Sequence, residues 1–165
     1  MDTFLLDTNL VSALYDSRHA KHAAAVGAVG ALPSGAAQLV SVITIGEVRF
    51  GLALSRAAGQ PLAHIETCLA RSESHPLAQV TRHTAEAFAN VKSSVALARL
   101  DVQRRAPRWV EVWSDRVTGE KLQIDENDLW IAAQAIERNY VVLTSDQDFT
   151  RVIASAVPDL RVQLV

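Results

Sequence analysis

The sequence predicts an α/β fold, in which a central parallel sheet is covered by helices on both faces. Three observations indicate this class. Short apolar runs lack the alternation of half-exposed strands, segments with helical spacing separate these runs, and the composition is that of one ordinary globular domain, with 165 residues, 49% hydrophobic and 21% charged. We therefore expect residues 1–165 to form a single three-layer α/β/α domain.

The predicted elements of the N-terminal region follow from apolar runs and turn residues. Residues 3–6 form a short apolar strand that stops at a polar turn, and apolar residues then recur with helical spacing over 10–14. A second helix is expected over 19–32, because Pro33-Ser34-Gly35 ends it. Residues 38–43 are rich in β-branched side chains and predict the next strand.

The middle of the chain is predicted to be mainly helical. A helix opens at Thr44 and ends before Gly59-Gln60-Pro61, and a second helix covers 62–69. A short extended piece is expected over 76–80. Residues 81–100 then form a long helix with a plausible apolar face.

The C-terminal part returns to the strand and helix pattern after an irregular stretch. Residues 101–121 show no strong period. A helix over 129–138 is followed by a continuously apolar strand over 140–143, and a last strand is expected near 160–165.

Composition and charge exclude several classes of protein. A single cysteine, Cys68, excludes an internal disulfide and a cysteine-rich zinc site, which favours a cytoplasmic protein. The net charge of −2 excludes an overtly basic nucleic-acid binder. The acidic start at Asp2 lacks the basic region of a signal peptide, and residues 33–35 interrupt the uncharged stretch 23–46, so we expect no membrane span.

Acidic residues follow the predicted strands. In open parallel sheets, ligands bind outside the carboxyl ends of the strands. Asp7 follows the first strand, Glu47 lies a few residues past the second, and Asp146 follows the strand 140–143. Asp128 lies near the first turn of the helix that leads into that strand.

Each acid also has a structural explanation. Thr44 and Glu47 match a capping box, Asp125 and Asp128 could form another, and Asp7 and Asp146 could cap a helix or stabilise a turn. Four carboxylates at one edge nevertheless repel one another unless a cation lies among them. Oxygen ligands without clustered His or Cys favour Mg²⁺ or Mn²⁺, and such ions support phosphodiester cleavage by activating water.

The residues around these acids resemble the four motif blocks of PIN-domain ribonucleases, and most of all the VapC toxins of type II toxin–antitoxin systems. The blocks are Leu5-Leu6-Asp7-Thr8-Asn9, Ser41-Val42-Ile43-Thr44-Ile45-Gly46-Glu47, Asn127-Asp128-Leu129-Trp130-Ile131-Ala132-Ala133 and Leu143-Thr144-Ser145-Asp146-Gln147-Asp148-Phe149. They occur in the family's order, and the resemblance covers nearly the whole chain.

The resemblance implies a PIN-like fold and a metal-dependent endoribonuclease that acts as a toxin. Asp7, Glu47, Asp128 and Asp146 match the acidic quartet that is catalytic and binds Mg²⁺ or Mn²⁺. Asn9 and Thr144 match the polar positions beside the metal, and Asp148 matches a less constant acid. The resemblance further implies an RNA substrate, a cognate antitoxin protein as partner, and a homodimer.

Two alternatives to this interpretation stay open. A haloacid-dehalogenase-type, Mg²⁺-dependent phosphohydrolase would use Asp7 as its nucleophile, but its motif needs a second Asp where this chain has Asn9. A catalytically silent PIN-like module that binds proteins is the other alternative, and the intact acidic quartet argues against it.

The irregular stretch 101–121 is longer than the family pattern leads us to expect. Residues 99–116 contain five arginines and three acids, and Trp109 lies within this stretch. This segment is the best candidate for an arm that contacts RNA through phosphate pairing and base stacking. The alternative is a surface helix whose Trp109 and Trp113 pack inward.

Overall fold

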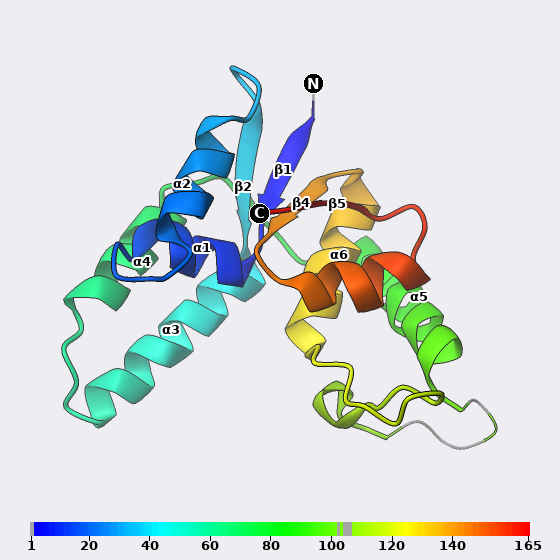
Figure 1. Ribbon diagram of the computed structural model, residues 1–165. Coiled ribbons are helices and arrows are strands. Elements are labelled where there is room, and N and C mark those ends of the chain that lie inside the picture. The colour runs from blue at the N-terminus through cyan, green and yellow to red at the C-terminus, as the bar shows by residue number, and fades with distance from the viewer. Residues whose placement is uncertain (1, 102, 104–106) are drawn as a thin grey trace.

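A computed structural model describes residues 2–101, 103 and 107–165, and it contains one five-stranded, all-parallel sheet (Figure 1). The strand order is β3-β2-β1-β4-β5. The strands are β1 (Thr3–Leu6), β2 (Ala37–Ser41), β3 (Leu77–Ala78), β4 (Val141–Thr144) and β5 (Arg161–Leu164). The predicted α/β class with a central parallel sheet is thus confirmed.

Helices cover both faces of the sheet, as Figure 1 shows. The helices are α1 (Thr8–Tyr15), α2 (His22–Gly30), α3 (Val42–Ala57), α4 (Ala63–Glu73), α5 (Arg82–Arg99), η1 (Val110–Val112), α6 (Glu126–Arg138) and η2 (Phe149–Ala154). The first four lie on one face, and α5, α6 and η2 lie on the other.

Alternate strand residues explain the three layers. Phe4 and Leu6 of β1 are buried against the helices α1 to α4, whereas Leu5 is buried in the core on the α5 and α6 side. In β4, Leu143 is buried on the same face of the sheet as Leu6, and Val142 is buried on the same face as Leu5. Successive side chains of a strand point to opposite faces, so continuously apolar strands suit a sheet covered twice.

Ser41 connects the two faces through a buried hydrogen-bond chain. Its hydroxyl accepts a bond from the Ile43 amide, which caps α3, and donates a 2.6 Å bond to Gln134 Oε1 of α6. The Gln134 amide then donates a 2.9 Å bond to the carbonyl of Ala78 in β3. Because Ser41, Gln134 and Ala78 are buried, these bonds avoid the cost of burying an unpaired amide or hydroxyl.

The structure corrects three sequence predictions. The strand predicted over 38–43 ends at Ser41, because the Ser41 cap turns Val42 and Ile43 into the first turn of α3 despite their β-branched side chains. The helix predicted over 19–32 covers only His22–Gly30. The third difference is η2, a π-helix that follows β4 and precedes β5 in the sequence and buries Phe149, where no helix was predicted.

The segment after α5 is not the surface helix considered as an alternative. In the described part of this segment, the regular structure consists of the short η1 helix and an antiparallel bridge between Ser114 and Lys121. Trp113 is buried and its indole N–H donates to the Pro107 carbonyl, whereas Trp109 is 57% exposed. The predicted inward packing is therefore confirmed for Trp113 and wrong for Trp109.

Two further sequence predictions concern this segment and the membrane. The arginines at 104 and 105, which belong to the proposed RNA-contacting arm, lie outside the described residues. Over the ranges that the structure describes, we find no helix with both the length and the apolar character needed to cross a membrane.

Candidate metal-dependent active site

The carboxyl ends of β1 and β4 place Asp7 at the centre of the candidate site. Leu6 pairs with Leu143 across these neighbouring strands, and the Asp7 amide donates a 3.1 Å bond to the Leu143 carbonyl. Asp7 then caps α1, with Oδ1 accepting a 2.7 Å bond from the Thr8 amide. Its position follows directly from a strand that ends where a helix begins.

Asp7 is the most deeply buried acid of the four. Asp7 is only 1% exposed, and its Oδ2 accepts a 2.7 Å hydrogen bond from the Thr144 hydroxyl. Burial raises the pKa of Asp7 to about 6, although the bonds from Thr144 and Thr8 oppose that rise. The negative charges of Asp146 and Glu47 contribute to this rise.

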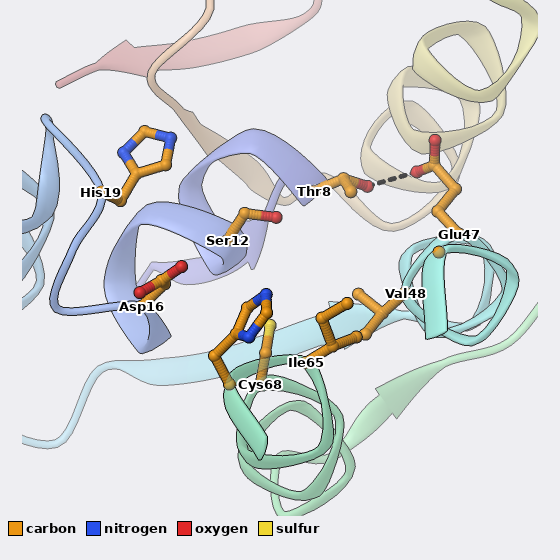
Figure 2. A pocket seen from close by; sticks show the side chains of 10 residues that line it. Thr8, Ser12, Asp16, His19, Glu47, Val48, Ile65 and Cys68 are labelled. Carbon is orange, nitrogen blue, oxygen red and sulfur yellow. Dashed lines mark hydrogen bonds between the residues drawn. The ribbon is translucent and has the colours of Figure 1, made fainter. Parts of the chain in front are cut away.

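Glu47 lies in the second turn of α3 and reaches toward the start of α1. Oε2 accepts a short hydrogen bond from the Thr8 hydroxyl, drawn as a dashed line in Figure 2, and Oε1 accepts a 3.0 Å bond from the Asn127 amide. Burial raises the pKa of Glu47, and the two bonds lower it. The predicted capping box of Thr44 and Glu47 is wrong, because Ser41 caps the helix and the Thr44 hydroxyl instead contacts that of Thr8.

Asp128 lies in the first turn of α6, where the predicted capping box with Asp125 is present. Asp128 Oδ2 accepts a 2.8 Å bond from the Asp125 amide, and Asp125 Oδ1 accepts a 3.0 Å bond from the Asp128 amide. Burial raises the pKa of Asp128 to about 8, and the charges of Asp125, Asp7 and Asp146 add to that rise. Asp128 thus caps a helix and also takes part in the acidic cluster.

Asp146 follows β4 in a turn that its own carboxylate stabilises. Oδ1 accepts a 2.8 Å bond from the Asp148 amide, as expected for a turn residue, and Oδ2 accepts a 3.3 Å bond from the Asn9 side chain. The Thr144 hydroxyl accepts a bond from the Asp146 amide. Asp148 is paired instead with Arg151, whose Nη2 lies 2.8 Å from Asp148 Oδ1.

Asp7 therefore lies within electrostatic reach of each of the other three predicted acids. Asp7 interacts with Glu47, Asp146 and Asp128. Within residues 2–101, 103 and 107–165, none of the four forms a salt bridge with Lys, Arg or His. Like charges brought together without a cation raise one another's pKa, which is the environment that a divalent ion relieves.

The donor atoms fit a hydrated Mg²⁺ or Mn²⁺ ion. Among the described side chains, no three Asp, Glu, His or Cys groups form a ready-made cage for an ion. Mg²⁺ usually retains several waters and uses only one or two carboxylates, so it does not require such a cage. A zinc site would need three or four close ligands, and the described part of this site lacks them.

Three residues of the site were not assigned a role from the sequence. Thr8 and Asn127 hold the two oxygens of Glu47, and Lys21 donates a 2.6 Å bond from Nζ to the Ser145 carbonyl. Lys21 and Asp146 line the same hollow. Thr8 and Asn127 each adjoin an acid in the motif blocks, and this neighbourhood could have indicated their role in the site. Nothing in the local sequence places Lys21 beside Ser145.

The comparisons with known proteins agree with this geometry. The model of the PIN domain matches residues 4–154, which is most of the chain. The chain belongs to the PIN-domain family. No curated protein matches it significantly. The expected PIN-like fold and the resemblance on which it was based are thereby confirmed.

Solved structures with this PIN-domain fold include chains of toxin–antitoxin proteins. In the structure of VapBC2 from Rickettsia felis bound to a promoter DNA fragment, one chain is 15% identical, with a TM-score of 0.66 and coverage of 99% of this chain and 98% of that one. For VapBC-5 from Mycobacterium tuberculosis, the identity is 21%, the TM-score 0.59 and both chains are covered completely. VapC20 of M. tuberculosis, described as a Sarcin-Ricin loop cleaving toxin, is 16% identical, with a TM-score of 0.54 and coverage of 90% and 94%.

Proposed function

We propose that this PIN-domain protein is a Mg²⁺- or Mn²⁺-dependent endoribonuclease and the toxin of a type II toxin–antitoxin pair. The observation that carries the proposal is the gathering of Glu47, Asp128 and Asp146 around the buried Asp7, with no salt bridge from any of the four to a Lys, Arg or His among the described residues. Family membership favours this function over the haloacid-dehalogenase-type phosphohydrolase.

The chain's own residues would hold the site in a defined geometry. Thr144 and the Thr8 amide fix the two oxygens of Asp7, while Thr8 and Asn127 fix those of Glu47. Asp7, Glu47, Asp128 and Asp146 would hold the ion, directly or through water. The ion would supply the positive charge that polarises the phosphodiester and lowers the pKa of the attacking water.

The decisive experiment is incubation of the purified protein with total cellular RNA, with Mg²⁺, with Mn²⁺ and with EDTA. Discrete cleavage products should appear with a divalent ion and disappear with EDTA and in an Asp7→Asn variant. Cleavage that EDTA and Asp7→Asn leave unchanged would contradict the metal site. A protein that binds Mn²⁺ in a titration and cuts no RNA would contradict the nuclease, and failure to bind Mn²⁺ would favour a silent binding module.

The proposed partners are a cognate antitoxin and a second copy of the chain. Structural neighbours solved as VapBC assemblies support the antitoxin. An exposed apolar strip on α3, including Phe50 at 66% exposure and Leu54 at 55%, supports a homodimer, because exposed apolar patches mark interaction sites. Analytical ultracentrifugation should show a dimer that Phe50→Glu converts to a monomer, and a monomeric parent protein would contradict the dimer.

A further inference from the structure

A pocket beside Glu47 is not used by the acidic cluster. It has a volume of about 250 Å³ and lies between α1, α3 and α4, where Thr8 and Glu47 form the end nearest the acids. Figure 2 shows Ser12 and Asp16 continuing along α1 away from Thr8, while Ile65 and Cys68 rise from α4. The pocket therefore leads from the acids into the space between three helices.

The lining combines an apolar floor with a polar rim. Val48, Gly51, Ile65 and Cys68 supply the floor. Ser12, Asp16, His19 and His64 supply polar groups, and the bidentate pairing of Asp16 with Arg18 offsets its negative charge. Small-molecule sites have this character, with apolar walls and a few polar groups that fix the orientation of the ligand.

The pocket's size and position indicate the class of ligand. It is smaller than the roughly 300–1,000 Å³ of pockets that take drug-sized molecules, so it suits a single planar ring system. Proteins that recognise single-stranded RNA splay out a base, stack it on aromatic or His side chains and hydrogen-bond its edges. His19 also lines a second hollow, which contains Lys21 and Asp146, so the two hollows adjoin at His19.

We infer that this pocket binds one unpaired base of the RNA substrate, next to the phosphodiester that is cut. The inference depends on the proposed nuclease function and adds a specificity site to it. A base held between the floor and His64 would fix the RNA backbone relative to Asp7 and Glu47. The pocket would thus help to determine where the RNA is cut.

Gly51 lines this pocket and also a separate hollow beside Phe50 and Leu54, so a larger side chain there would reduce the space in the pocket. A Cβ added at Gly51 would meet no atom within 4 Å, so Gly51→Leu should fill open space without displacing the core, and it replaces a glycine in the interior of a helix. Gly27→Leu is the matched control, since Gly27 also lies within a helix, has equally open space and lines none of the hollows described above. His64→Ala removes the candidate stacking ring without filling the pocket.

The test uses short RNA substrates that span a cleavage site, each with one abasic residue at a different position. In the parent and in Gly27→Leu, an abasic residue at one position beside the scissile bond should raise KM roughly tenfold or more. In Gly51→Leu and His64→Ala, the intact substrate should already have the raised KM, and the abasic residue should add little. Full base dependence in Gly51→Leu, or no base dependence in the parent, would overturn the inference.

A binding measurement separates this inference from the proposed function. Isothermal titration of the parent and Gly51→Leu with AMP, GMP, CMP and UMP requires no cleavage. If a nucleotide binds the parent but not Gly51→Leu while no RNA is cut, the pocket assignment stands and the nuclease assignment fails. If RNA is cut without base dependence and Gly51→Leu instead loses binding of the antitoxin, the pocket is a protein-docking site and the inference fails.

Discussion

The hydroxyl of Thr144, the last residue of β4, donates a 2.7 Å hydrogen bond to Oδ2 of Asp7, the residue that follows β1. This bond joins two neighbouring strand ends and lowers the pKa of Asp7 against the effect of burial. Thr144 also accepts a bond from the Asp146 amide. It therefore positions two of the four acids while lying outside the set itself.

Replacing Thr144 tests this positioning role. Thr144→Val keeps the shape of the side chain but removes the bond, so the pKa of Asp7 should rise above about 6. We expect kcat/KM for RNA to fall roughly ten- to a hundredfold, since a bond to a charged group contributes about 1.5–3 kcal/mol. The acidic limb of the pH–rate profile should move to higher pH, and Thr144→Ser should restore both. An unchanged profile in Thr144→Val would contradict the role.

Asp7→Asn should stabilise the metal-free protein at high pH. The pKa of Asp7 is 3.8 ordinarily and about 6 in the fold, so its contribution to stability is fully present below pH 4 and is lost as the pH rises through 6. Asparagine keeps Oδ1 as the acceptor for the Thr8 amide and carries no charge. In EDTA at pH 8, we expect a gain of roughly 1–3 kcal/mol, or about 2–12 °C in Tm.

The same measurement at pH 4 should show little or no gain for Asp7→Asn, because the parent's Asp7 is then largely protonated. Thermal unfolding followed by circular dichroism provides the readout. Asp159→Asn, at an exposed acid, is the control and should change Tm little at either pH. A lower Tm for Asp7→Asn at pH 8 would show that the negative charge does not strain the fold.

Affinity for Mn²⁺ should increase with pH. Binding requires Asp7 and Asp128 to lose their protons, and their pKa values are about 6 and about 8. Titration calorimetry should show an affinity roughly tenfold or more higher at pH 8 than at pH 6, with protons released on binding. Asp128→Asn should weaken binding at pH 8 and flatten this dependence. An affinity that does not change between pH 6 and pH 8 would contradict the participation of both acids.

Lys21 should contact RNA phosphate. Its Nζ uses one donor on the Ser145 carbonyl, in the hollow that also contains Asp146. Lys21→Ala should weaken RNA binding several-fold at low salt and reduce the slope of log K against log salt by about 1. Arg56→Ala, at an exposed cation at the far end of α3, is the control. Equal effects of both substitutions, measured by fluorescence anisotropy, would indicate only a general effect of charge.

Much of the fold could be predicted because its signals are local. Apolar strands, the turn at residues 33–35 and polar residues at strand ends indicated the parallel sheet and the place of Asp7. Residues 42 and 43 were assigned to the wrong element because β-branched side chains favour strands. The Ser41 hydroxyl instead accepts a hydrogen bond from the Ile43 amide, which favours helix initiation and could have been recognised as a local cap. Its second bond, to a glutamine 93 positions away, could not be predicted from local sequence.

The candidate site was partly predictable for the same reason. Each acid adjoins a strand end or a helix start, so the resemblance and the sheet geometry pointed to one edge. The contacts of Thr8 with Glu47 and of Lys21 with Ser145 connect residues 39 and 124 positions apart, and no spacing rule reaches that far. The alternative that placed Trp109 and Trp113 on one helix face depended on spacing alone, but residues 110–112 between them form a short 3₁₀ turn.

The chain of hydrogen bonds from Ser41 through Gln134 to Ala78 fixes the position of the Ser41 cap of α3 relative to helix α6 on the opposite face of the sheet. Ser41 determines where α3 begins, and the start of α3 determines how far Glu47 lies from the ends of the strands. Gln134, on the opposite face of the sheet, holds Ser41 and the edge strand together. Alignment of the acidic cluster is therefore maintained in part by a glutamine that is not one of the four acids and belongs to the other helical layer.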